Sequence, residues 1–435
     1  MRNPVGRMKQ RQKLAISAGA LLLVVAAAGI WSLSAAGTSQ TTGPDVTVIS
    51  ITGTGNYGAV SGIRAFAVGT TSCNVGDQPV WWCNGNKGFC SDEQHPVIAQ
   101  NLYRLKDGRF EQIGMSWLKH GFVSTNSFDS NCGSCAGSPH GGSQLGVGCT
   151  DTYGSSLNGS RPLGMRSEVN VQTGSFPYPY TSVATSTVVD QRMQVREDDL
   201  NPALNTGARY WAEGQYVTED DALAGNGLNN ASYREVTVSG PSFDLPAVGS
   251  TTREKAAIYV WPVVDPTVEI MAVDNTGASP IERFDVARKV TDLGGGVWHY
   301  EYAIHNMNSD RSARGFTVDF PSNTTITNVG FHGVAHHSGE PYATADWTST
   351  VDTPTGRVTW QTEDFATNAN ANALRWGTMF SFWFDANSGP NTASHSIELF
   401  KPGSPTALFF TFGTLQLFAD GFETGDTTAW TATVP

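Results

Sequence analysis

The first 36 residues of the chain decide the compartment in which the rest must fold. Residues 1–13 are basic, Leu14 to Trp31 is an uninterrupted apolar run of 18 residues, and Ser34-Ala35-Ala36 is a small-residue cleavage site. These three features in this order are typical of a secretory signal peptide. We therefore predict a signal peptide over residues 1–36 and a mature protein that is secreted, periplasmic or on the cell surface. The apolar run is also long enough for an uncleaved membrane anchor, which stays open as an alternative.

Six cysteines lie between residues 73 and 149 of this exported chain. They are Cys73, Cys83, Cys90, Cys132, Cys135 and Cys149. An even number of cysteines in an oxidising compartment predicts three disulfides, and six cysteines allow 15 pairings among which the sequence does not choose. Cys83 with Cys90 is the favoured local pair, because the two would close a short Gly/Asn-rich loop. Zinc ligation by the Cys132-Gly-Ser-Cys135 pair with His140 and Cys149 is the alternative, and an oxidising compartment favours disulfides over it.

The composition indicates strands joined by many turns. The chain is 39% hydrophobic and 15% charged and contains 47 glycines, a balance that fits an all-β protein better than a helical one. In residues 298–304 Trp298, Tyr300, Tyr302 and Ile304 alternate with other residues, as in a strand with one buried face. The expected strands are 46–52, 63–68, 110–117, 187–195, 208–217, 233–238, 298–304, 315–320, 325–331, 357–361, 378–384 and 407–417.

These strands predict two β domains in series. The expected parts are a linker over 37–45, a disulfide-stapled β-rich domain over 46–245, an Ig-like β-sandwich over 255–417 and a flexible tail over 418–435. Residues 239–256 are rich in Gly, Pro and Ser and are typical of a boundary.

The charge balance argues against nucleic acid as a partner. The leader holds five basic residues and no acidic one, so its removal would lower the net charge from −12 to −17. Such a surface repels phosphate backbones. The pattern Gly53-x-Gly55-x-x-Gly58 resembles a dinucleotide fingerprint, but a strand-like segment follows it where that fingerprint needs a helix. We therefore expect a Gly-rich turn there and no nucleotide.

Residues 115–170 are the most site-like part of the chain for a catalyst. His120 is a candidate general base, Asp151 or Glu168 a group that orients it or acts as an acid, and Arg166 a clamp for an anionic group. The simpler interpretation is a loop-rich segment whose polar side chains satisfy backbone groups. The sequence contains no G-x-S-x-G, H-E-x-x-H or Walker motif.

Metal ligands and ligand-stacking rings are candidates elsewhere. His332, His336, His337 and Glu340 are candidate ligands for a transition metal, with incidental surface histidines as the alternative. Asp198-Asp199 and Glu219-Asp220-Asp221 are candidate Ca²⁺ ligands or solvated turn residues. Ca²⁺ and Zn²⁺ thus stay open as cofactors. The candidate contacts for a sugar ring and its hydroxyl groups are Trp81, Trp82, Tyr153, Asn158, Asn170 and Tyr178.

Several motifs resemble those of a set of uncharacterised secreted multi-domain bacterial proteins. They include GMSWLKHGF, LGVGCTD, HYEYAIHNMNSDRS and NALRWGT, and the likeness covers residues 46 to about 405. The tail FADGFETGDTTAW resembles a C-terminal segment of many exported proteins of Gram-negative bacteria. The resemblance implies secretion and a layout of several sandwiches, and it implies no reaction.

Three functions follow from these observations. The leading one is a non-catalytic secreted or cell-surface protein that binds an extracellular polysaccharide or matrix component, because β modules stand in series without a catalytic signature. The second is a secreted hydrolase or lyase with its site in residues 115–170. The third is an extracellular metal-binding protein. The membrane would be a partner only through an uncleaved N-terminal signal.

Overall fold

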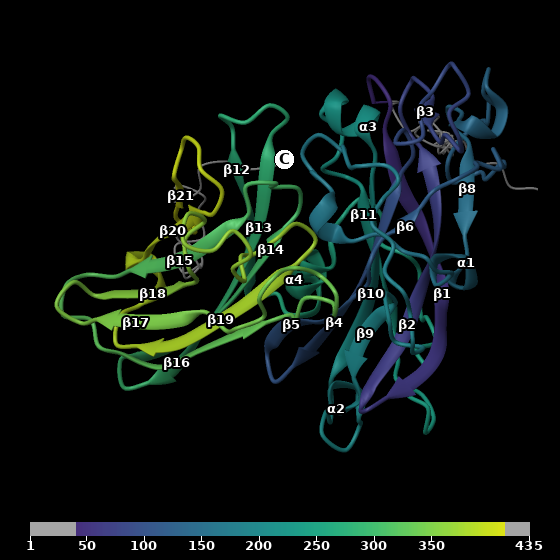
Figure 1. Ribbon diagram of the computed structural model, residues 1–435. Coiled ribbons are helices and arrows are strands. Elements are labelled where there is room, and N and C mark those ends of the chain that lie inside the picture. The colour runs from purple at the N-terminus through teal and green to yellow at the C-terminus, as the bar shows by residue number, and fades with distance from the viewer. Residues whose placement is uncertain (1–40, 414–435) are drawn as a thin grey trace, which may run out of the picture. The chain divides into compact units, whose positions relative to one another are not determined.

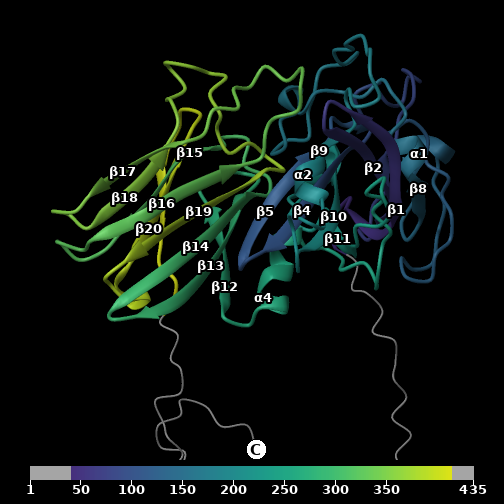
Figure 2. The same cartoon turned by 90° about the horizontal axis from the view of Figure 1, so that it is seen from below.

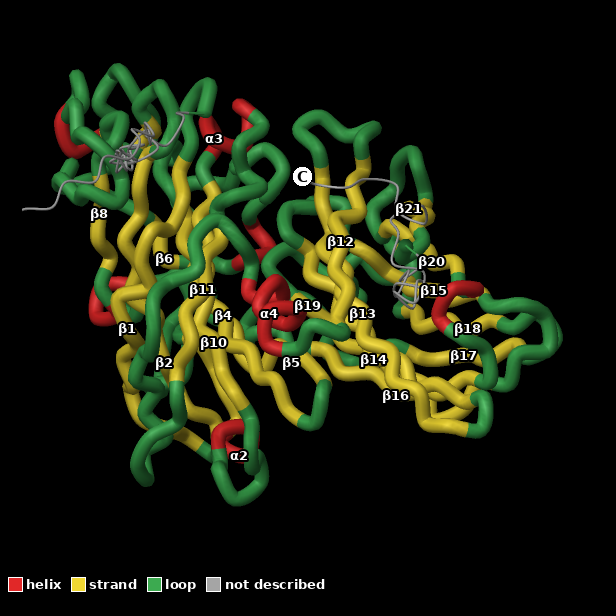
Figure 3. Tube along the Cα trace, turned by 180° about the vertical axis from the view of Figure 1, so that it is seen from behind, coloured by secondary structure: helices red, strands yellow, loops and turns green. Residues whose placement is uncertain are grey.

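Two β assemblies make up the described part of the computed structural model, which covers residues 41–413. The described residues belong to one compact unit (Figure 1). The predicted signal peptide, the first part of the linker and the predicted tail lie outside the described residues. Strands dominate and the helices are short (Figure 3), as the composition predicts.

A nine-stranded sheet forms the first assembly. Its main path runs β1-β2-β9-β5-β4-β10-β11, while β6 pairs with β4 and β8 pairs with β2. Its strands are β1 (Val46–Val60), β2 (Ile63–Asn74), β4 (Val97–Lys106), β5 (Arg109–Met115), β6 (Lys119–His120), β8 (Thr150–Tyr153), β9 (Met193–Arg196), β10 (Arg209–Val217) and β11 (Ala231–Val236). β4 and β5 form a hairpin through Asp107 and Gly108, whose φ angles of 51° and 85° are those of a type I′ turn.

A loop-rich layer between β2 and β8 carries all the cysteines. The disulfides are Cys73–Cys132, Cys83–Cys90 and Cys135–Cys149. They confirm both the preference for disulfides and the local Cys83–Cys90 pair. The layer also holds a two-stranded sheet of β3 (Val80–Trp81) and β7 (Gln144–Leu145). We call residues 73–96 and 121–149 the stapled layer.

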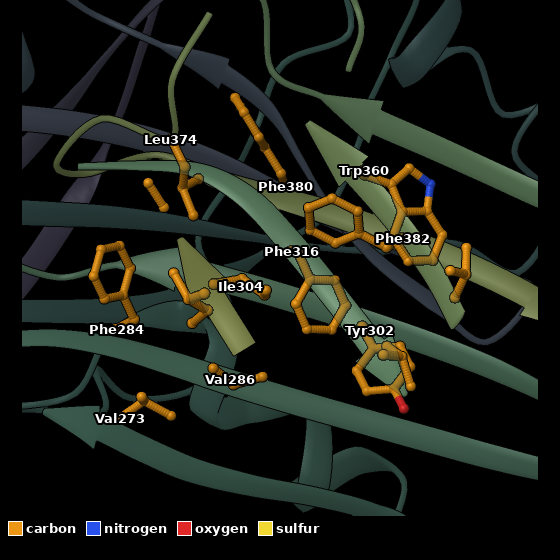
Figure 4. Packing of buried hydrophobic residues seen from close by; sticks show 14 of the residues in the cluster. Val273, Phe284, Val286, Tyr302, Ile304, Phe316, Trp360, Leu374, Phe380 and Phe382 are labelled. Carbon is orange, nitrogen blue, oxygen red and sulfur yellow. The ribbon is translucent and has the colours of Figure 1, made fainter. Parts of the chain in front are cut away.

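Two five-stranded sheets pack face to face in the second assembly and form the predicted sandwich. One sheet has the order β12-β13-β14-β19-β16 and the other β17-β18-β15-β20-β21. The strands are β12 (Val268–Asn275), β13 (Glu282–Gly294), β14 (Val297–Asn306), β15 (Ala313–Asp319), β16 (Ile326–Gly333), β17 (Thr348–Asp352), β18 (Arg357–Gln361), β19 (Met379–Ala386), β20 (Ser394–Leu399) and β21 (Ala407–Phe410). Figure 4 shows Phe316 and Trp360 of one sheet packed against Phe382 of the other, with ring centroids 5.0 and 5.3 Å from that of Phe382. Tyr300, Tyr302 and Ile304 face this core, as the alternation predicts, but Glu301 and Ala303 on the other face are buried too, so the expectation of a single buried face is wrong.

The helical segments are single turns or little more. They are α1 (Ser155–Asn158), α2 (Glu197–Leu200), α3 (Glu219–Ala224), α4 (Trp261–Val264), η1 (Gly141–Ser143), η2 (Arg166–Glu168), η3 (Ala257–Val260) and η4 (Pro390–Thr392). None of the helices within residues 41–413 has the length and hydropathy needed to cross a membrane.

The two assemblies share a hydrophobic core. Tyr103, Phe110 and Trp211 of the nine-stranded sheet cluster with Ala303 and Met379 of the sandwich. Figure 2 shows β5 beside β19 at this junction. Hydrogen bonds cross it as well: the amide N–H of Met379 donates to Gln112 Oε1 over 2.7 Å, and the Ser381 hydroxyl donates to the Phe110 carbonyl over 2.8 Å.

Two local predictions are wrong. Residues 53–58 lie within β1 and do not form a turn; the turn follows at Ser61 and Gly62, and the glycines accompany register shifts in the β1–β2 ladder. The strand expected over 187–195 is reduced to β9, since the Asp190 carboxylate accepts the backbone N–H groups of Ser186 and Thr187 and fixes a bend there.

Candidate ligand-binding site

Three rings gather on the surface of the stapled layer. The centroids of Phe89 and His140 are 4.3 Å apart with their planes 20° from parallel, and Trp81 lies 5.4 Å from His140 and 6.3 Å from Phe89. Phe89 is 46% exposed and His140 is exposed. We call these three residues the aromatic platform. Phe89 and His140 stack on each other, and the exposed parts of these rings offer an apolar surface that suits contact with a sugar ring.

Short backbone links and a disulfide hold the platform in place. Trp81 belongs to β3, pairs with Gln144 of β7, and donates its backbone N–H to the Asp220 carboxylate over 2.8 Å. Phe89 lies in the loop closed by Cys83–Cys90, and His140 directly precedes η1. These restraints fix the rings before any ligand arrives, which lowers the entropy cost of binding.

Polar groups border the rings. Asn84, Asn86 and Lys87 of the same loop are exposed. The Lys87 ammonium donates to the Ser143 hydroxyl over 2.9 Å, which brings a cation from the disulfide loop to the segment after His140. A few polar groups around an apolar surface are the arrangement that orients a polyhydroxylated ligand.

Exposed aromatic side chains are concentrated in this part of the molecule. Four of the five large aromatic residues exposed among residues 41–413 lie between 89 and 178; they are Phe89, Phe122, Phe128 and Tyr178. The fifth, Phe409, lies on β21 of the sandwich and is 82% exposed.

The predicted ligand contacts divide between surface and interior. Trp81 belongs to the platform, and Tyr178 is 44% exposed, near Tyr180 and His95. Asn170 is half-buried and accepts the backbone N–H of Thr173, as a turn residue does.

Trp82, Tyr153 and Asn158, in contrast, are at most 1% exposed. The Tyr153 hydroxyl accepts the Phe122 N–H, and Asn158 donates to the carbonyls of Val68 and Tyr153. Their burial corrects the expectation that they face a ligand.

His120 lies beneath a cover of aromatic rings. Its Nδ1 is 2.8 Å from Nε2 of His95, Tyr180 stacks on it with centroids 3.8 Å apart, and Phe176 packs against both histidines. Burial lowers the pKa of His95 to about 4 and, with the neighbouring His95 and Lys119, lowers that of His120 to about 2. Both imidazoles are therefore neutral near pH 7. A Cβ at Gly164 would come 2.4 Å from His120 Nε2, so this packing depends on that glycine.

The other candidate catalytic residues each serve a separate contact. Asp151 accepts the N–H and hydroxyl of Thr125, and Glu168 accepts the N–H of Thr181. Within residues 41–413, no hydrogen bond or ion pair joins any two of His120, Asp151, Arg166 and Glu168.

Arg166 is 5% exposed and connects the nine-stranded sheet to the sandwich through hydrogen bonds. Its guanidinium donates to the carbonyls of Ser116, Gly377 and Gln100, and burial lowers its pKa to about 10. Its backbone N–H donates to Glu340 over 2.6 Å. The structure thus joins two residues that the sequence had assigned to different sites.

The candidate metal ligands are dispersed. His332 lies in β16 and contacts the Gln112 carbonyl, His337 contacts the carbonyls of Ser338 and Arg192, and His336 is buried beside Tyr342. Among the candidate Ca²⁺ ligands, Asp221 is buried and Asp220 is half-buried, which corrects their interpretation as solvated turn residues. In the part of the chain that the structure describes, no three His, Cys, Asp or Glu side chains are placed to hold a metal ion.

Sequence reasoning missed Phe89 and His95. A phenylalanine inside a Gly/Asn-rich disulfide loop is itself a signal, because such a loop has no core in which to bury the ring. His95 carries no comparable signal, since its partner His120 is 25 residues away in β6. The chain was compared with protein-family models and with curated proteins, and neither comparison yields a match.

Proposed function

We propose that this chain is a secreted, non-catalytic protein that binds an extracellular carbohydrate through its aromatic platform. The observation that carries the proposal is the cluster of the Trp81, Phe89 and His140 rings, in which Phe89 is exposed on a loop closed by a disulfide and His140 is exposed just before η1. Exposed rings held rigidly cost little entropy on binding, and their faces match the C–H faces of a pyranose.

Secretion is part of the proposal and has two supports. The leader has the pattern of a signal peptide, and all six cysteines pair in disulfides. An immunoglobulin-like relationship of the sandwich, and membership in the set of secreted bacterial proteins that the motifs resemble, belong to the same proposal.

The contacts of the candidate catalytic residues favour binding over hydrolysis. A general base needs a group to orient it and access to a substrate. His120 instead is 6% exposed and has His95, Phe176 and Tyr180 as its neighbours. The hydrolase hypothesis therefore ranks second.

Calorimetric titration of the purified mature chain with soluble β-glucan, chitin, xylan and starch oligosaccharides tests the proposal. We expect saturable binding to one series without new reducing ends. Phe89→Ala should weaken it by about tenfold, which corresponds to about 1.4 kcal/mol. Phe409→Ala is the matched control, since this ring is exposed on the sandwich, and should leave the affinity unchanged.

Two results would count against carbohydrate binding at the platform. One is the absence of binding to all four series. The other is equal affinity of the Phe89→Ala and Phe409→Ala proteins for a sugar that the parent chain binds. Release of reducing ends that depends on His120 would favour the hydrolase.

A further inference from the structure

His299 lies between two carboxylates on the face of the sandwich that meets the nine-stranded sheet. Its Nδ1 is 2.5 Å from Asp385 Oδ1, directly across the β14–β19 ladder, and its Nε2 is 2.9 Å from Glu301 Oε1. Ionised carboxylates only accept hydrogen bonds, and a neutral imidazole has one N–H. Two such contacts at once therefore call for the imidazolium form.

The same Glu301 carboxylate forms an ion pair with a residue of the nine-stranded sheet. Arg109 of β5 donates Nε to Oε2 over 2.8 Å and Nη2 to Oε1 over 2.7 Å, a bidentate pair. The Arg109 guanidinium also lies 3.3 Å above the centroid of the Trp383 ring on β19. His299 thus contacts Glu301, and Glu301 in turn forms a direct ion pair between the two assemblies.

The charged groups around this face balance when His299 is protonated. Lys289 of β13 lies opposite Glu301 in the β13–β14 ladder and pairs with Asp265 over 2.7 Å. Thr291 of β13 lies opposite His299, and Thr327 of β16 lies opposite Asp385, so neither neighbour adds a charge. Three cations then face three carboxylates; the cations are Arg109, His299 and Lys289, and the carboxylates are Asp265, Glu301 and Asp385. Loss of the His299 proton leaves one negative charge uncompensated.

We propose that His299 stabilises the junction between the nine-stranded sheet and the sandwich in a pH-dependent manner. As imidazolium it bridges Asp385 and Glu301 and keeps Glu301 aligned with Arg109. Without the proton, one imidazole lone pair faces a carboxylate oxygen, and the resulting repulsion destabilises the junction. The inference is independent of the proposed sugar site, which lies in the stapled layer.

The direction of the pH effect follows from the folded-state pKa. The hydrogen bond with Glu301, followed by that with Asp385, raises the pKa of His299 above 6.5 against the opposing effect of burial. A group whose folded pKa is raised stabilises the fold fully below its unfolded pKa. That stabilisation is lost as the pH rises through the folded value.

The test uses the full mature chain and two independent measurements. The first is NMR titration of the His299 ring, which should give a pKa above 6.5 that falls in Asp385→Asn. The second is the melting temperature from pH 5.5 to 9 for the parent chain and His299→Gln, with His140→Gln as an exposed-histidine control. The deficit of His299→Gln should be largest at pH 5.5 and shrink towards pH 9.

Hydrogen exchange locates the effect. After correction for intrinsic rates, amides of residues 108–111 and 299–302 should exchange about threefold faster or more at pH 9 than at pH 6 in the parent chain. In His299→Gln the two pH values should give equal protection. A titration value at or below 6.5, or a melting deficit that does not change with pH, would overturn the proposal, and the titration is informative even where a variant folds poorly.

Discussion

Gly330 lies so close to the indole ring of Trp383 that a Cβ at position 330 would be 2.0 Å from Cε2 of that ring. The Arg109 guanidinium packs on the same ring, 3.3 Å from its centroid. The β16–β19 ladder has a register shift between residues 327 and 330, which brings the β16 backbone up to the ring. A residue without a side chain is therefore required for Trp383 to lie flat and receive Arg109.

Gly330→Ala should displace Trp383 and weaken the junction. Overpacking of this kind costs about 1–3 kcal/mol, and we expect a loss of that size in the free energy of unfolding measured by urea denaturation. Gly154→Ala is the control, because a Cβ there meets no atom within 4 Å. Equal stability of the two variants would show that the ring can move aside freely.

Arg166→Lys should be far more destabilising than a conservative change suggests. Lysine cannot reproduce the fork that reaches the carbonyls of Ser116, Gly377 and Gln100, so buried acceptors lose their donors. We expect a loss of about 3 kcal/mol or more in unfolding free energy. Arg209→Lys, at an exposed bidentate pair with Glu235, should cost less than about 1 kcal/mol. Similar costs for the two changes would contradict this role of Arg166.

The disulfides should differ in their contribution to stability. Cys73–Cys132 spans 59 residues and Cys83–Cys90 spans 7. Loop entropy then predicts losses of about 4 and about 2 kcal/mol when each pair is replaced by alanine. Calorimetric unfolding of the two double variants checks this order, and a reversed order would show that loop closure is not the main term.

The His95–His120 pair should make the fold sensitive to acid. Burial lowers the pKa of His95 from 6.5 to about 4, so its neutral form contributes stability above pH 6.5 that is lost as the pH falls towards 4. The shift corresponds to about 3 kcal/mol. Urea denaturation between pH 7 and 4 should therefore show a smaller loss in His95→Gln than in the parent chain. Parallel curves for the two proteins would contradict the burial of a neutral His95.

The features that the sequence predicted well are those set by neighbouring residues. Alternation in residues 298–304 gave β14, and the short spacing of Cys83 and Cys90 gave their disulfide. β12 and β13 were missed, because Glu269 in β12 and Arg288 and Lys289 in β13 interrupt the apolar pattern and find partners of opposite charge only in the folded chain. β4 was missed for a similar reason: Gln100 and Asn101 are polar yet buried.

The candidate site was harder to predict because its contacts join distant residues. His120 and Arg166 were singled out by residue type, but Arg166 finds its acceptor Gly377 211 positions away. Trp81 is half-buried, whereas the adjacent Trp82 is fully buried. Trp81 ends β3 and pairs with Gln144 of β7, whereas Trp82 follows the strand and packs into the core, and this difference depends on contacts with distant residues.

The core shared by Tyr103, Phe110 and Trp211 with Ala303 and Met379 limits how this protein can be dissected. A chain cut near residue 250 would leave three large rings of the first half facing water. In the second half, strands β14 and β19 would lose the residues that cover them. Each fragment would then carry an exposed apolar surface, which promotes self-association. Recombinant proteins for crystallisation, ligand screens or fusion should therefore keep both halves on one polypeptide, and a tag is better placed at an end than between them.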